Sequence, residues 1–405
     1  MIGKGKTTKT LTTLYREIII DDDPEKRYPM RFGLDICVSD DGVRIRNDLA
    51  IELLQDEKIA QNWSDESLLE EIDSTIRDLG LQKKIDDYPD FTSKANELIN
   101  KLILDFKERE AITVVEGLLV SEPLEIGQVT FYPFEQKQDL LTQPPFNSLF
   151  SDVYATRDCI ATGRYRAEAR RSIELLHRDT EYGLNILRFI SSLVWYNEKT
   201  RQMSISGRPR ENVAYSLSID ADGHPTAMAE VAFSPIPVNL NEKIIQYANF
   251  YGLSDLTTLV NKANPTEIEK SLLTAIQWFG DATNELQPLS AFMKFYIPID
   301  ILLKREEENA KDCIPDRLSR LTDPWNTDKE RTAQTISDLH QLIRERNYVF
   351  HSGTPEKRNS EYLRLAARGF AIGAINQVRQ RIKSEKLRTQ DDLINWLEVQ
   401  AKKFG

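Results

Sequence analysis

The sequence predicts an α+β protein in which a mixed, β-containing N-terminal half is followed by an all-helical C-terminal domain. Strand-like runs that contain glycine, such as ITVVEGLLV and EIGQVTFYPF, occur in the first half of the chain. After Pro237 the apolar residues recur at helical spacing almost to the C-terminus. The chain has 405 residues, of which 40% are hydrophobic and 29% charged, as is typical of a globular protein with two or three domains.

We expect three segments along the chain. Residues 1–160 are predicted to form a mixed α/β N-terminal domain with a sensor or regulatory role. Residues 161–240 are expected to be a connecting region that holds a long helix and a β-hairpin. Residues 241–405 are predicted to form the helical domain.

The elements of the first segment follow from its apolar patterns. The run RFGLDICVSDDGVRI over residues 31–45 predicts two strands joined by a turn at its DDG tripeptide. Residues from about 63 to 110 predict helix, because Leu and Ile recur there at spacings of three and four. Residues 112–120 and 125–134 predict strands, since β-branched and aromatic residues dominate both runs.

The connecting segment combines one helix with one hairpin. Residues from about 164 to 196 predict a long helix, because their apolar residues follow helical spacing. Residues 212–233 predict a hairpin, whose first arm alternates apolar and polar residues and whose turn falls at Asp222-Gly223.

Helix signals organise the last segment. Asn264, Pro265 and Glu267 supply a cap, a proline at the first helical position and an acidic residue in the first turn. The next helix has an apolar face that ends near residue 303, and Pro298 should kink it. The remaining elements are expected in this order: an acidic, mobile stretch over 305–328, a helix from about 328 to Gly353, and a last pair of helices over 361–382 and 389–402.

Charge and composition restrict the classes of function. The net charge of −11 argues against a general nucleic-acid coat, but residues 341–405 carry 13 Lys and Arg against 7 Asp and Glu. No apolar run approaches the roughly 20 residues of a membrane span, so we expect a cytoplasmic protein without a membrane partner. Three cysteines and four histidines are scattered along the chain, which predicts no disulfide framework, no metal site and no cofactor.

The most informative segment is RERNYVFHSG, residues 344–353, near the end of a predicted amphipathic helix. Arg346 interrupts an apolar stripe that we expect to be buried, and it therefore requires a partner. That stripe consists of Ile336, Leu339, Ile343 and Phe350. A second, polar stripe is formed by His340, Arg344, Asn347 and His351. Gly353 is predicted to end the helix.

An imidazole, a guanidinium and an amide held close together provide what metal-free RNA cleavage needs. The imidazole of His351 can exchange a proton near pH 7. The guanidinium of Arg346 can hold a phosphate in a planar fork. The amide of Asn347 can orient either group.

The pattern Arg-Asn-x-x-x-His at a helix end resembles the R-x(4–6)-H signature of HEPN domains, the all-helical ribonucleases of prokaryotic antiviral defence and toxin–antitoxin systems. The preceding helix, AFMKFYIPIDILLK, is similar to the family's aromatic-rich helix, with Asp300 where a Glu is more usual. The layout looks most like the ApeA-type HEPN proteins of phage resistance. The similarity is strongest over residues 266–382.

This resemblance implies a metal-independent endoribonuclease in which the ribose 2′-OH attacks the adjacent phosphate. Arg346, Asn347 and His351 would be catalytic, and Asp300 would support them. Arg344, which also fits the motif's spacing before His351, would bind phosphate, as would Lys357 and Arg358. Because one histidine supplies half of an acid–base pair, the resemblance implies a homodimer with a composite site. Small residues in the next helix, Ala366, Gly369 and Gly373, would permit close helix packing near this site.

Two alternatives stay open at this point. The domain can be catalytically silent, with Arg346 as a structural ion-pair partner, and serve to dimerise or to bind a phage-derived protein. It can also be the RNase toxin of a toxin–antitoxin pair, held silent by an inhibitory partner.

Overall fold

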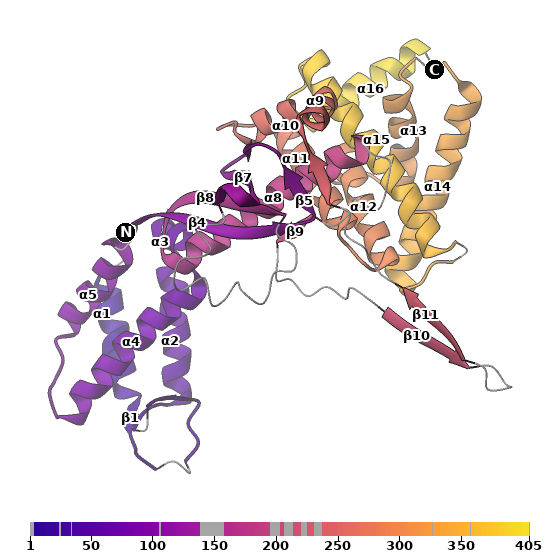
Figure 1. The fold of residues 1–405 in the computed structure, drawn as a ribbon. Helices are drawn as coiled ribbons and strands as arrows, with labels where there is room; N and C mark the ends of the chain where they lie inside the picture. Colours follow the sequence, from indigo (N-terminus) through magenta and orange to yellow (C-terminus); the bar gives the residue numbers. More distant parts are fainter. Residues whose placement is uncertain are drawn as a thin grey trace. The chain divides into compact units, whose positions relative to one another are not determined.

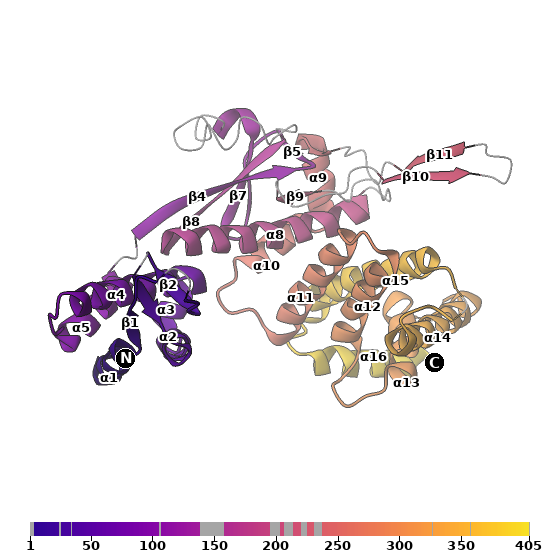
Figure 2. The same ribbon diagram turned by 90° about the horizontal axis from the view of Figure 1, so that it is seen from below.

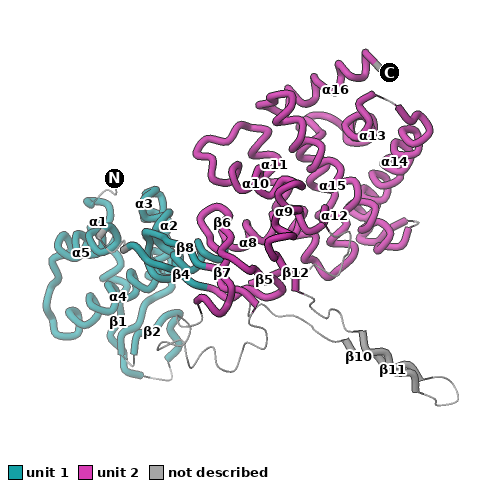
Figure 3. The backbone as a smooth tube through the Cα atoms, turned by 45° about the horizontal axis from the view of Figure 1, so that its top comes forward, with its two compact units in different colours: residues 1–112, 162–178 teal, residues 113–161, 179–405 magenta. Residues whose placement is uncertain are grey.

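A computed structural model describes the chain at residues 4–23, 26–33, 35–104, 107–137, 158–194, 203–205, 214–219, 225–230, 237–325, 327–356 and 358–404. Helices and small sheets alternate along it, so the predicted α+β class is confirmed (Figures 1 and 2). The chain divides into two compact units (Figure 3). Unit 1 comprises Met1–Ile112 and Thr162–Arg178, and unit 2 comprises Thr113–Ala161 and Asp179–Gly405.

Unit 1 is mainly helical, with one small antiparallel sheet of order β1-β3-β2. Its core is built from aliphatic residues on the inner faces of its helices, including Leu11, Leu14, Leu49, Ile72 and Ile76. Its elements are α1 (Lys4–Arg16), β1 (Ile18–Ile20), β2 (Met30–Phe32), β3 (Ile36–Val38), α2 (Asp40–Leu53), α3 (Glu57–Asn62), α4 (Asp65–Lys84) and α5 (Phe91–Leu104). The unit also contains residues 107–112 and 162–178, which belong to elements that continue into unit 2.

The predicted strand pair over residues 31–45 is wrong in its second half. The expected DDG turn is instead the first turn of α2, since the Ser39 side chain accepts a hydrogen bond from the Gly42 backbone N–H at 3.1 Å. Asp40 and Asp41 then lie in the first turn, where negative charge interacts favourably with the helix dipole.

A five-stranded sheet of order β6-β7-β8-β4-β9 follows in the chain. Its strands are β4 (Lys107–Glu116), β6 (Leu124–Ile126), β7 (Val129–Pro133), β8 (Cys159–Ala167) and β9 (Ser204–Ile205). The predicted strand over residues 112–120 is divided at Gly117, whose φ of 74° breaks the strand. The shorter strand β5 (Leu118–Val120) follows it and pairs in parallel with β12 (Val238–Leu240).

The predicted hairpin is confirmed. Strands β10 (Ala214–Ile219) and β11 (Pro225–Glu230) pair antiparallel, with Ala214 opposite Glu230. Its turn, predicted at Asp222-Gly223, lies outside the described residues.

The long helix α8 (Ala169–Val194) confirms the helix predicted after residue 164, and its second half lies between the sheet and the helices of unit 2 (Figure 2). On one side Gly183 approaches the Phe131 ring so closely that an added Cβ would lie 3.0 Å from it. On the other side the Asn185 amide donates to Gln277 Oε1 at 2.9 Å and to Asp281 Oδ1 at 3.1 Å. Arg188, which is 1% exposed, donates to the Met203 carbonyl oxygen and to Glu181.

The rest of unit 2 is helical, and its core is formed around α12. Helix α12 packs mainly against α11 and α15, and its Phe292, Phe295 and Ile299 are fully buried. The helices are α9 (Glu242–Phe250), α10 (Leu253–Val260), α11 (Glu267–Thr283), α12 (Pro288–Leu303), α13 (Ala310–Thr322), α14 (Lys329–Ser352), α15 (Ser360–Glu385) and α16 (Gln390–Phe404).

Three local features of this half bear on the predictions: the start of α11, the proline in α12, and the segment that contains α13. The N-cap of α11 is Thr266 rather than Asn264, because the Glu269 carboxylate accepts from the Thr266 backbone N–H at 2.7 Å. Helix α12 continues through Pro298. The acidic stretch predicted to be mobile contains α13, which is fixed because the guanidinium of Arg317 donates to the Leu303 carbonyl oxygen and to both Glu308 carboxylate oxygens.

The two units also differ from the three predicted segments. Residues Thr113–Ala161, predicted to belong to the N-terminal domain, group with the helical half. The reason is that β5 pairs with β12, and that β6 and β7 pack on the second half of α8. Among the described residues no helix is long and apolar enough to cross a membrane.

Two glycines in helices should respond oppositely to replacement by alanine. A Cβ at Gly369 in α15 would meet nothing within 4 Å, so Gly369→Ala should stabilise the protein by about 0.5–1 kcal/mol through helix propensity. A Cβ at Gly280 in α11 would lie 2.1 Å from Oδ1 of the buried Asn185, so Gly280→Ala should destabilise it by about 1–3 kcal/mol. Urea unfolding of both variants checks the two signs, and equal shifts would contradict the described packing of α8 on α11.

The Glu308–Arg317 pair should make stability depend on pH. Hydrogen bonds from Arg317 lower the pKa of Glu308 to about 2, from an ordinary value of 4.5. The stability contributed by this carboxylate is therefore present above about pH 4.5 and is lost as the pH falls towards 2. The difference in unfolding free energy between wild type and Glu308→Gln should shrink over that interval. Glu307→Gln, at the exposed neighbouring position, is the control, and an identical pH profile for both variants would refute the pair's role.

Candidate functional site

The last turns of α14 carry Arg346, Asn347 and His351, and a hydrogen bond joins the first two. Helix α14 begins at an N-cap, Asp328, whose carboxylate accepts from the Arg331 N–H. It ends at Gly353, whose φ of 76° places it in the left-handed region and whose N–H bonds to the Val349 carbonyl oxygen at 2.8 Å. The predicted helix end is therefore confirmed.

Arg346 is held by three neighbours. Its Nη2 donates to Asp300 Oδ2 at 3.1 Å, which links α14 to α12. Its Nη1 donates to Asn347 Oδ1 at 3.0 Å. Its guanidinium carbon lies 5.2 Å from the centroid of the Tyr296 ring. Arg346 therefore has in Asp300 the partner that its place on the apolar stripe requires, as the catalytically silent alternative also expects.

Asp300 is largely buried. Its side chain is 18% exposed, and burial raises the pKa of this carboxyl, while the nearby Arg346 and Lys304 oppose that effect. Oδ1 of Asp300 and the hydroxyl of Tyr296 are both buried, and the two side chains interact with each other without ideal hydrogen-bond geometry. Because a largely buried carboxylate is costly when unpaired, Asp300 depends on its ion pair with Arg346.

The predicted polar stripe is confirmed as a solvent-facing stripe, since all of its members, His340, Arg344, Asn347 and His351, are exposed. The predicted apolar stripe is correct in part. Leu339 and Ile343 are buried and Ile336 is partly buried, but Phe350 is 73% exposed. Its ring centroid lies 5.6 Å from that of His351, at an interplanar angle of 88°. The end of α14 therefore presents an imidazole and a phenyl ring together.

The loop after α14 is tied back to the helix, which the sequence did not indicate. Glu345 is 4% exposed, and its Oε2 accepts from the Glu356 backbone N–H at 2.8 Å. Arg344 binds the two Glu356 carboxylate oxygens, both at 3.0 Å. The sequence does not indicate that Glu345 is buried, because its partner is a backbone N–H that only the fold brings close. These bonds fix the helix end that carries His351.

The two candidate motif arginines are thereby distinguished. Arg344 is 64% exposed and engaged by Glu356, whereas Arg346 is bonded to Asn347 and Asp300. Of the other predicted phosphate contacts, Arg358 donates to Gln341 Oε1 at 3.0 Å and stacks on the Tyr362 ring at 4.8 Å. Lys357 lies outside the described residues.

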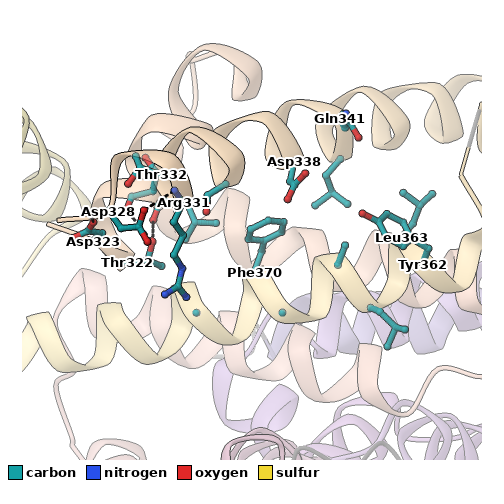
Figure 4. Close-up of a pocket in the computed structure, with 18 of the residues that line it drawn as sticks. Thr322, Asp323, Asp328, Arg331, Thr332, Asp338, Gln341, Tyr362, Leu363 and Phe370 are labelled. Atoms are coloured by element: carbon teal, nitrogen blue, oxygen red, sulfur yellow. Dashed lines mark hydrogen bonds between the residues drawn. The ribbon is translucent and has the colours of Figure 1, made fainter. Parts of the chain in front are cut away.

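A groove of about 890 Å³ lies between α13, α14 and α15 (Figure 4). Helix α14 packs on α13 and meets α15 at few points, which leaves this space open. In Figure 4, Asp338 and Gln341 come from α14, and Tyr362, Leu363 and Phe370 come from α15. The small residues predicted to serve close helix packing, Ala366, Gly369 and Gly373, line this groove instead. Within the described chain no helix packs closely against Gly369.

The groove and the polar stripe lie on different faces of α14. Asp338 and Leu342 line the groove. Asn347 comes nine residues after Asp338, which is about two and a half helical turns and places it on the opposite face. The described lining of the groove includes four carboxylates, Asp323, Asp328, Asp338 and Glu345, and two guanidiniums, Arg331 and Arg358. This excess of negative charge does not favour a polyanion.

Within the described residues, no three His, Cys, Asp or Glu side chains are placed to hold a metal ion. No protein-family model, curated protein or solved structure matches the chain.

Truncating the two arginines should affect stability unequally. Arg346→Ala leaves Asp300 largely buried without its ion-pair partner and should destabilise the protein by about 1–3 kcal/mol. Arg344→Ala removes an exposed pair and should cost no more than about 1 kcal/mol. Chemical unfolding of both variants tests this order.

The double variant Arg346→Ala with Asp300→Asn should recover part of the loss, because it removes the stranded charge. Additive losses in this double-mutant cycle would show that the two side chains do not interact.

Proposed function

We propose that the protein is a metal-independent endoribonuclease of the HEPN type, acting in antiviral, abortive-infection defence in the cytoplasm. One observation carries the proposal: Asp300 and Asn347 orient Arg346 on the same end of α14 that carries the exposed His351. The resemblance of the motif to HEPN domains supports the reaction class. The basic charge of residues 341–405 supports an RNA substrate.

Arg346 is proposed to stabilise the charge that develops on the scissile phosphate. A guanidinium has five N–H donors, and the described hydrogen bonds of Arg346 use one of them on Asn347 and one on Asp300. The other donors can bind phosphate oxygens in a fork. Because the group is already oriented, little reorganisation is required when the substrate binds. Arg344, which shares the exposed polar stripe with His351, and Lys357 are proposed to contribute more distant phosphate contacts, whereas Arg358 lines the groove on the other face.

His351 is proposed to transfer protons. The ribose 2′-oxygen forms a bond to phosphorus, the bond from phosphorus to the 5′-oxygen breaks, and a 2′,3′-cyclic phosphate results. One imidazole accepts the proton of the 2′-OH, and a second acid must protonate the leaving 5′-oxygen. We propose that the second acid is His351 of another copy, in a homodimer whose two motifs form one composite site.

A second candidate function is favoured by the groove between α13, α14 and α15. Its volume of about 890 Å³ is within the range of ligand-binding pockets, and its lining combines aromatic, carboxylate and hydroxyl groups. On this proposal the domain is catalytically silent and the groove receives a partner, such as a phage-derived or inhibitory protein.

The nuclease proposal predicts that His351→Ala lowers RNA cleavage at least about 100-fold, because general acid–base catalysis is lost. Purified wild-type protein should cut RNA in EDTA and leave 2′,3′-cyclic phosphate ends. The same RNA with 2′-deoxyribose at the cut position should resist. His340→Ala is the matched control, since His340 is exposed on the same stripe of α14, about three turns earlier.

Three results would count against the nuclease: no cleavage by wild type, cleavage that requires a divalent metal, or equal loss in both histidine variants. Protection of cells from phage provides the second readout. If His351→Ala protects as well as wild type, while the groove-filling Gly369→Leu abolishes protection, the partner-binding function is favoured instead.

A further inference from the structure

Phe350 is an exposed aromatic residue that the catalytic proposal does not use. Its side chain is 73% exposed, although helical spacing places it on the apolar stripe of α14. The last buried residue of α14 is Val349, and Phe350 follows it directly. A phenyl ring in this position contributes little to the core, and its exposed surface is available to bind a ligand.

The ring belongs to a group of four side chains on the last two turns of α14. Residues four apart on a helix are surface neighbours, about 5–6 Å between Cβ atoms. Phe350 is therefore the neighbour of Arg346, and His351 is the neighbour of Asn347. The ring of Phe350 also lies against His351, with 5.6 Å between the ring centroids. A guanidinium, an amide, a phenyl ring and an imidazole thus share one surface.

These four groups correspond to the parts of one nucleotide. Phe350 lies one helical turn from Arg346. If Arg346 binds a phosphate, the base of the same nucleotide can therefore reach the Phe350 ring. Aromatic rings bind unpaired bases by stacking, and they do so with little regard to sequence. The groove on the opposite face of α14 offers no equivalent, because its described lining is net negative.

We propose that Phe350 stacks on the base next to the scissile phosphate, and that the substrate is therefore RNA that is unpaired at the cut. This inference rests on the proposed RNA cleavage, since it assigns the phosphate to Arg346. In a duplex the bases are already stacked on one another and their faces are closed to the ring. Phe350 is thus a specificity residue, which selects single strands, loops and bulges over paired stems.

Binding measured without cleavage tests the stack directly. In a His351→Ala background, Phe350→Ala should weaken binding of a single-stranded RNA oligonucleotide about 5- to 100-fold, the usual effect of losing one stacked base. Phe350→Trp should restore it. Binding of the same sequence as a duplex should not change. Phe250→Ala is the matched control, because Phe250 is 82% exposed on α9 and makes no part of the motif.

An abasic scan locates the stacked base. A single abasic ribose, moved along the oligonucleotide, should weaken binding at one position by the same factor as Phe350→Ala, and the two changes together should cost no more than either alone. Equal affinities of Phe350→Ala and Phe250→Ala for single-stranded RNA would overturn the inference. So would an equal loss on single strand and duplex.

Sedimentation of Phe350→Ala addresses the competing explanation. If the variant changes oligomeric state while its affinity per site is unchanged, the ring is a contact between copies of the chain, and the stack is refuted. The proposed nuclease activity can fail independently of the stacking. If the wild-type protein binds RNA through Phe350 but cuts none, the stacking is supported and the cleavage reaction is refuted.

Discussion

Cations withdrawn from water must be paired, and in the helical half this requirement joins elements that lie side by side in the fold. Arg188 of α8 binds the Met203 carbonyl oxygen and Glu181. Arg317 of α13 binds the Leu303 carbonyl oxygen at the end of α12, together with Glu308. Arg346 of α14 binds Asp300 of α12. Each arginine would be costly to bury alone, so these bonds fix α8 against the segment before β9, and α13 and α14 against α12.

The third of these pairs has a double consequence for α14. This helix packs on α13 but meets α15 at few points, so it depends on its link to α12 more than a fully enclosed helix would. The same link orients the guanidinium that is proposed to hold phosphate. On the proposed function, a change at Asp300 should therefore affect both the packing of α14 and the binding of phosphate.

Periodicity predicted most of this helical half, because an amphipathic helix records its buried face in its own sequence. Short sequence motifs predicted the structure less well where the same motif is typical of two different structures. The DDG tripeptide after Ser39 is typical of a turn and also of a helix start, and the capping serine decided the outcome. Helical spacing predicts that Phe350 is buried, but it does not show which residues of a helix face the fold leaves exposed. The position of Arg346 and His351 was predictable from one segment, whereas the buried Glu345 and the groove depend on contacts between distant residues that no local pattern encodes.

The parallel pairing of β5 with β12 has a consequence for how the chain is made. Val238 lies opposite Leu118, so this ladder closes a loop of about 120 residues. During synthesis β5 leaves the ribosome long before its partner, and its edge stays open until β12 emerges. Every helix from α9 to α16, including the one that carries His351, is translated only after that strand. The end of α14 that carries His351 is therefore made after both strands of this ladder have left the ribosome.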